Sequence, residues 1–140
     1  MRRAARFSPL LGLLVLSATA HGDEVITWAE ESSTVAGALV PAGRAAFAAT
    51  LQAGTGPLDS QLWVFGGMLD GSTFSRELWR FSVLIGTWAQ ELAAGPAAAH
   101  GSRMVAVGRK LYVYGGAPSL DALVWVFNTL ARTWSSIASI

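Results

Sequence analysis

Beyond residue 44 the hydrophobic residues of this chain occur in short segments, and Gly, Pro, Ser or Asp separates each segment from the next. Short apolar runs between turn-forming residues are typical of antiparallel strands and not of helices. In the segment 111–114 both faces of the expected strand are apolar, so we expect its sheet to be stacked between similar sheets. The predicted fold class is all-β. The expected strands cover residues 45–52, 62–65, 77–82 and 87–91 in a first unit, and residues 103–107, 111–114, 123–127 and 133–137 in a second.

The two units are copies of one repeat. Residues 61–67 (QLWVFGG) are matched by residues 110–116 (KLYVYGG) at an offset of 49. Further along, residues 78–81 (LWRF) are matched by residues 124–127 (VWVF) at an offset of 46. An upstream match is looser, and it sets Pro41 and Arg44 against Pro96 and Arg103.

An aromatic residue and a tryptophan follow the double glycine of each unit. Phe81 precedes Trp88 by seven positions, and Phe127 precedes Trp134 by the same number. This combination resembles the kelch repeat, which forms four-stranded blades of a β-propeller and has a period of about 50 residues. The resemblance makes Gly66, Gly67, Gly115 and Gly116 the diglycines and Trp88 and Trp134 the blade tryptophans, and it places Phe81 and Phe127 where the family usually has tyrosine.

Each motif residue has a structural role. A glycine pair after a strand permits a positive φ or a close approach of the backbone, and large aromatic side chains fill the space between neighbouring blades. We therefore interpret residues 44–95 and 96–140 as two blades, and residues 21–43 as the last strand of a preceding blade followed by a linker. The fold expected from the resemblance is an incomplete propeller of kelch-type blades.

Closed propellers typically contain four to eight blades. Three explanations for two blades remain open. The chain is a fragment of a longer propeller, or several chains self-associate to complete a ring, or the two blades form an open monomer.

The first 20 residues have the features of a secretory signal peptide. Three arginines precede an apolar stretch, and residues 18–20 (ATA) form a small-x-small cleavage site. We predict cleavage after Ala20 and a secreted, periplasmic or extracellular product without a membrane span; an uncleaved anchor is the alternative. Cleavage would change the net charge from +1 to about −2, because three arginines and no acidic residue are lost. That balance argues against nucleic acid as a partner.

Residue types that carry chemistry are scarce. The chain has no cysteine, which excludes disulfides, thiolate metal sites and a cysteine nucleophile. The two histidines are separated: His21 lies at the predicted cleavage site and His100 in a loop rich in Ala and Gly. We expect no catalysis, no metal and no cofactor. The alternative, from another functional class, is a fragment of a secreted kelch-type propeller enzyme that resembles galactose oxidase and lacks the catalytic blades.

Binding is the expected function. In an alternating blade, the loops after the second and fourth strands emerge at the same end, and loops on a rigid scaffold are common recognition sites. We expect an exported binding or scaffold module that contacts a protein or glycan partner. Asp70 and Asp121 occupy equivalent loops, where turn formation also explains an aspartate. The candidate partner-binding residues in these loops are Asp70, Ser72, Arg76, Ser119 and Asp121.

Overall fold

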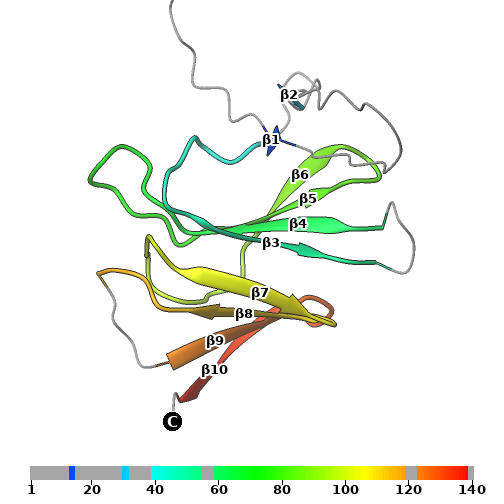
Figure 1. Cartoon of the computed structure of the whole chain (residues 1–140). Coiled ribbons are helices and arrows are strands. Elements are labelled where there is room, and N and C mark those ends of the chain that lie inside the picture. Colours follow the sequence, from blue (N-terminus) through cyan, green and yellow to red (C-terminus); the bar gives the residue numbers. More distant parts are fainter. Residues whose placement is uncertain (1–12, 15–29, 32–38, 55–58, 119–122, 139–140) are drawn as a thin grey trace, which may run out of the picture.

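The computed structural model describes residues 13–14, 30–31, 39–54, 59–118 and 123–138, and these residues form strands, turns and loops but no α-helix (Figure 1). The all-β prediction is confirmed: two four-stranded antiparallel sheets account for most of the structure. Sheet 1 consists of β3 (Ala48–Gln52), β4 (Gln61–Phe65), β5 (Leu78–Ser82) and β6 (Thr87–Glu91). Sheet 2 consists of β7 (Arg103–Val107), β8 (Lys110–Tyr114), β9 (Leu123–Asn128) and β10 (Thr133–Ala138).

All the strands predicted in the two units are present, most within one residue of the predicted ends. The largest difference lies at β3, which was expected from residue 45 and begins at Ala48. Ala45 is bridged to Met68, and Ala46 has a φ of 52°, a left-handed conformation that an extended strand does not contain. The backbone therefore turns before the ladder of sheet 1 starts.

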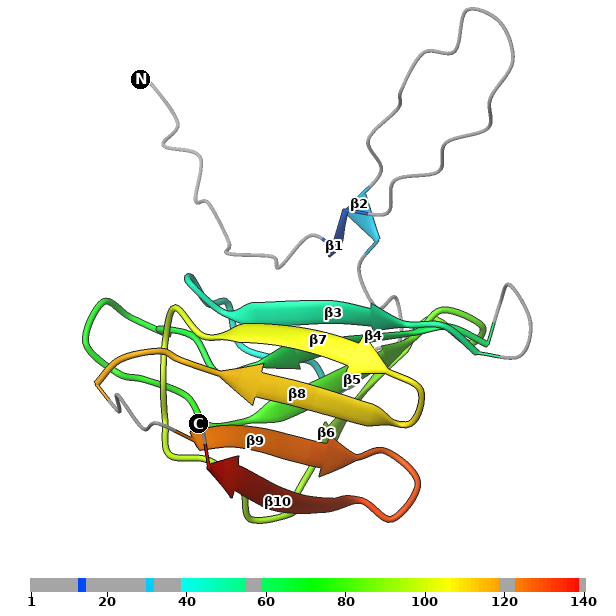
Figure 2. The same ribbon diagram turned by 60° about the horizontal axis from the view of Figure 1, so that its bottom comes forward.

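Strands that follow one another in the chain are neighbours within each sheet. This up-and-down order is the order of a propeller blade. The first strands of the two sheets, β3 and β7, lie side by side, whereas β6 and β10 form the opposite edges (Figure 2). The two sheets do not close into a ring within the described residues, so the arrangement is consistent with an incomplete propeller.

The core lies between the sheets. Trp63 and Phe65 of β4 point toward sheet 2, where Leu111, Val113 and Phe127 meet them. The ring centroids of Trp63 and Phe127 are 5.7 Å apart in a tilted arrangement. Each of these side chains is almost fully buried, and burial of a large apolar side chain contributes about 1.5–3 kcal/mol. This layer of apolar contacts holds the sheets together.

The spacing of seven between the aromatic residue and the tryptophan has a direct structural explanation. Phe81 and Trp88 are opposite each other across the β5–β6 hairpin, and Phe127 and Trp134 are opposite each other across the β9–β10 hairpin. In both pairs the ring centroids lie 5.1 Å apart. Hairpins with turns of equal length thus bring the repeated aromatic residues into the same cross-strand contact.

One part of the repeat alignment is wrong. Arg44 was set loosely against Arg103, but the bridges of Ala45 with Met68 and of His100 with Ala117 occupy the same place in the two units. Ala45 therefore corresponds to His100, and Arg44 to the residue before it. The burial of the two arginines agrees with this correction, because Arg44 is buried and Arg103 is exposed.

Most of the segment 21–43, interpreted as a preceding strand and a linker, lies outside the described residues. Its described part includes β2 (Glu30–Glu31), which pairs with β1 (Leu13–Leu14). β1 and β2 lie on the side of sheet 1 that faces away from sheet 2 (Figures 1 and 2). Among the described residues we find no helical segment with the length and hydrophobicity that crossing a bilayer requires.

The glycine pairs after β4 and β8 show why glycine is needed there. Gly66 has a φ of 67° and Gly115 a φ of 66°. A Cβ added to Gly66 would lie 2.5 Å from the carbonyl oxygen of Ala99, whereas a Cβ added to Gly115 would meet open space. Gly66 is therefore required both for its positive φ and for the absence of a side chain, whereas Gly115 is required only for its positive φ.

This difference gives a matched pair of substitutions. We expect Gly115→Ala to lower the free energy of unfolding by about 1–2 kcal/mol, the cost of a left-handed alanine. Gly66→Ala should cost about 2 kcal/mol more, because the backbone near Ala99 must also move. Urea unfolding of both variants measures the difference. Equal losses would contradict the assigned steric role of Gly66.

Candidate functional site

Asp70 forms a turn in the β4–β5 loop, one of the predicted partner-binding loops, at one end of sheet 1. Its Oδ1 accepts hydrogen bonds from the backbone N–H of Ser72 (3.1 Å) and of Thr73 (2.7 Å), and its Oδ2 accepts one from the Thr73 hydroxyl (3.0 Å). The bonds from the Thr73 and Ser72 backbone hold the pKa of the Asp70 carboxyl below its usual value of 3.8. The interpretation of Asp70 as a turn former is confirmed.

The other candidate residues of these loops differ in what they contact. Ser72 also donates its hydroxyl to Asp70 Oδ1 (3.3 Å), so these two side chains are bonded to each other. Arg76 is exposed and forms no hydrogen bond or ion pair with the described residues. Ser119 and Asp121 lie outside the described residues. Arg76 is thus the described candidate whose side chain is available to a partner.

A buried polar network, which the sequence did not reveal, lies at the same end. The guanidinium of Arg44 donates to the Gly66 carbonyl (3.0 Å) and forms an ion pair with Glu77 (2.7 Å). Trp79 Nε1 donates to the same Glu77 oxygen (3.0 Å). Burial alone would raise the pKa of Glu77, but the hydrogen bonds from Trp79 and Arg44 and the charge of Arg44 outweigh it and lower that pKa. The network anchors the segment before β3 to sheet 1.

His100, the histidine considered as a metal ligand, stacks on an aromatic ring. Its ring centroid lies 4.7 Å from that of Phe74, with 24° between the planes. Within the described residues no group of three or more His, Asp and Glu side chains is placed to hold a metal ion. The stack joins the β4–β5 loop of sheet 1 to the segment that precedes β7.

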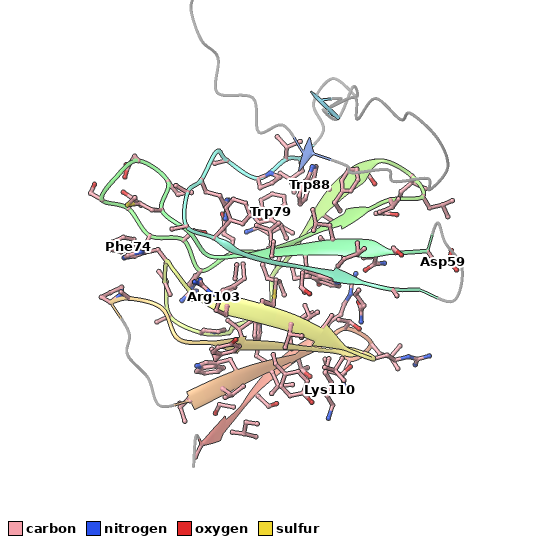
Figure 3. The ribbon with its side chains drawn as sticks, in the orientation of Figure 1. Asp59, Phe74, Trp79, Trp88, Arg103 and Lys110 are labelled. Atoms are coloured by element: carbon pink, nitrogen blue, oxygen red, sulfur yellow. The ribbon has the colours of Figure 1, made fainter. Side chains whose placement is uncertain are left out.

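A cleft lies at the opposite end, where the β7–β8 and β9–β10 turns of sheet 2 face the surface of sheet 1. Figure 3 shows the two ends: Phe74 and Arg103 mark the loop end, and Asp59 and Lys110 mark the cleft end. The cleft has a volume of about 240 Å³. Sheet 1 contributes Gln52, Gln61, Arg80 and Glu91 to its lining, and the turns of sheet 2 contribute Arg109 and Arg132.

Gln52 fixes the two sheets to each other at this cleft. Its Oε1 accepts a hydrogen bond from Trp63 Nε1 (3.0 Å), which orients the amide. Its Nε2 then donates to the Gly108 carbonyl (2.6 Å) and to the Thr129 hydroxyl (3.2 Å), one in each turn of sheet 2. A single amide therefore positions both turns against sheet 1.

A buried carboxylate lies between two guanidinium groups in the cleft. The Glu91 side chain is 6% exposed, and its Oε1 lies 3.0 Å from Arg80 Nε and 3.4 Å from Arg132 Nη2. The short distance to Arg80 makes an ion pair but not a hydrogen bond, because the buried Arg80 Nε has no acceptor in a suitable direction. One hydrogen-bond donor of the cleft is therefore left without a partner.

These charges depart from the repeat. At the offset of 46, Arg80 and Glu91 correspond to Val126 and Ile137, so the second unit has apolar residues at both positions. Arg132 corresponds to Gly86 and keeps the glycine's left-handed conformation, with a φ of 56° against 65°. A left-handed arginine costs about 1–2 kcal/mol, and strained residues of this kind cluster at functional sites. Blade architecture alone explains none of the three charged residues.

Compared with known protein families, the chain matches none.

The turn made by Asp70 gives a prediction about pH. The folded pKa of Asp70 lies below 3.8, so its contribution to stability is present above 3.8 and is lost as the pH falls through the folded pKa. We expect Asp70→Ala to lower the melting temperature at neutral pH and the difference from the original chain to disappear in acid. Thermal unfolding across this pH range measures it. A difference that is constant with pH would contradict the assignment.

Proposed function

We propose that the chain is an exported kelch-type blade unit that acts as a binding or scaffold module without catalysis of its own. The glycine pairs support the family assignment, because all four residues follow the second strand of a sheet and have positive φ values of 66–103°. The Phe–Trp pairs support it too, because they occupy the same cross-strand position in both sheets. Export rests on the signal-peptide features of residues 1–20.

The observation that carries the propeller proposal is the way the sheets stack. Trp63 and Phe65 of sheet 1 contact sheet 2, but their repeat equivalents Tyr112 and Tyr114 lie on the face of sheet 2 that points away from sheet 1. The contact therefore joins two different faces, front to back. A front-to-back contact can be repeated from sheet to sheet, and it forms a ring when the rotation between neighbours closes, whereas a contact between identical faces joins only two sheets.

The open face of sheet 2 is the next place for such a contact. We define the open face as the apolar residues that point away from sheet 1: Val105, Val107, Tyr112, Tyr114, Val124, Val126 and Ile137. Tyr114 is 48% exposed, whereas its equivalent Phe65 is 1% exposed. An apolar sheet face of this kind is typical of an interaction surface.

We propose that a second copy of the chain covers the open face. The face that would contact it is the face of sheet 1 that points away from sheet 2, because this face is the repeat equivalent of the face of sheet 2 that packs on sheet 1. In sheet 1 that face carries Val64, Trp79 and Phe81, which are buried within the chain. β1 lies on this side of sheet 1 and belongs to the predicted leader (Figures 1 and 2). Leader cleavage would remove one segment from that side before copies assemble.

The molar mass of the exported chain in solution tests this proposal. We expect a discrete multimer by size exclusion with light scattering, and an intact mass per chain that begins at residue 21. Tyr114→Glu should reduce the multimer to smaller species, because it buries a charge in the contact. Leu84→Glu is the matched control: Leu84 is 58% exposed in the β5–β6 turn, outside the open face, and its substitution should leave the mass unchanged. A monomeric exported chain would contradict self-association.

A further inference from the structure

We propose that the cleft between the sheets binds a singly charged acidic sugar of the hexuronic acid class. The inference deepens the proposed binding function and rests on it, since it gives that module a ligand. It places the ligand at the end of the sheets opposite to the loops in which the sequence predicted binding.

The charge of the cleft selects a monoanion. Three guanidinium groups line it, and each comes from a different element: Arg80 from β5, Arg109 from the β7–β8 turn and Arg132 from the β9–β10 turn. Two carboxylates, Asp59 and Glu91, line it as well. One positive charge is therefore in excess, which a single carboxylate balances. The planar guanidinium also matches a carboxylate through paired hydrogen bonds.

The arginines of the cleft differ in how accessible they are to a ligand. Arg80 Nε is buried and has no acceptor, although Glu91 is close. Arg109 is exposed, and its side chain forms no hydrogen bond or ion pair with the described residues. Arg80 Nε itself is not accessible to a ligand, but the Arg80 side chain as a whole is 30% exposed, so another part of it faces the cleft. Arg109 therefore supplies a binding contact without giving up a bond inside the protein, and the Arg80–Glu91 ion pair lies beside it in the same cleft.

The size and the other polar groups favour a sugar over a bare anion. A volume of about 240 Å³ is just below the range of about 300–1,000 Å³ usual for small-molecule sites, and suits one sugar ring. The carboxylate of Glu91 and the amide of Gln61 line the same cleft and can pair with hydroxyl groups. Trp63 is only 2% exposed, so recognition here rests on hydrogen bonds and charge and not on ring stacking.

Titration of the purified chain with small probes tests the proposal. We expect glucuronate to bind with a Kd of about 1 mM, and glucose, inorganic phosphate and N-acetyl-aspartate amide to bind at least about tenfold more weakly, by calorimetry or NMR. Arg109→Gln should weaken glucuronate binding about tenfold, because a charge-assisted bond is lost. Arg103→Gln is the matched control: Arg103 lies at the other end and donates to the Gly101 carbonyl, so binding should not change (Figure 3).

Several results would overturn the proposal. The proposal is wrong if glucuronate does not bind. It is also wrong if the Arg103→Gln and Arg109→Gln variants lose glucuronate affinity equally. Equal binding of phosphate would reduce it to an anion site, and equal binding of N-acetyl-aspartate amide would point to an acidic peptide. Circular dichroism of both variants establishes that they remain folded. The cleft lies within one chain, so a failure here leaves the multimer proposal standing, and a monomeric chain leaves the cleft proposal standing.

Discussion

The apolar contact between the two sheets is the interaction on which the rest of the structure depends. Trp63 and Phe65 from one sheet and Leu111 and Phe127 from the other are nearly inaccessible to water. The contact joins unlike faces, so the pair of sheets has a direction. As a result, the apolar face of sheet 1 that carries Trp63 and Phe65 is covered, and the equivalent face of sheet 2 is open. The proposed assembly follows from this difference.

The two ends of the sheets differ in how their polar groups are used. At the loop end, Asp70 accepts hydrogen bonds within its own turn and Arg44 forms an ion pair with Glu77. These side chains therefore use many of their donors and acceptors within the protein. At the cleft end, Arg80 and Glu91 replace the apolar residues of the other unit, and their charges are not fully paired by hydrogen bonds. Unsatisfied buried polar groups are rare in folded proteins, which distinguishes the cleft end from the loop end.

The sequence predicted much of the fold because the relevant signals are local. Alternating apolar segments gave the strands, and the spacing from Phe81 to Trp88 is the spacing of a cross-strand pair in a hairpin. The match of Arg44 with Arg103 failed because it relied on residue types, whereas the backbone bridges align different positions. The signal for the cleft was present, since Arg80 and Glu91 interrupt the repeat, but their meeting with Arg132 depends on how the sheets are placed, which no local pattern encodes.

The glycine pair of sheet 1 carries a further consequence. The N–H of Gly67 donates to the Ala99 carbonyl (2.8 Å), and the Ala99 N–H donates to the Ser75 carbonyl (3.1 Å). These main-chain hydrogen bonds, together with the stack of His100 on Phe74, fasten the segment that leads into sheet 2 to sheet 1. In the proposed ring the number of sheets depends on the angle between neighbouring sheets, and we expect the backbone hydrogen bonds at this junction to contribute to that angle. Substitutions in the core would therefore change the strength of the contact between the sheets, whereas a substitution at Gly66 or Gly67 would also change the geometry of the junction.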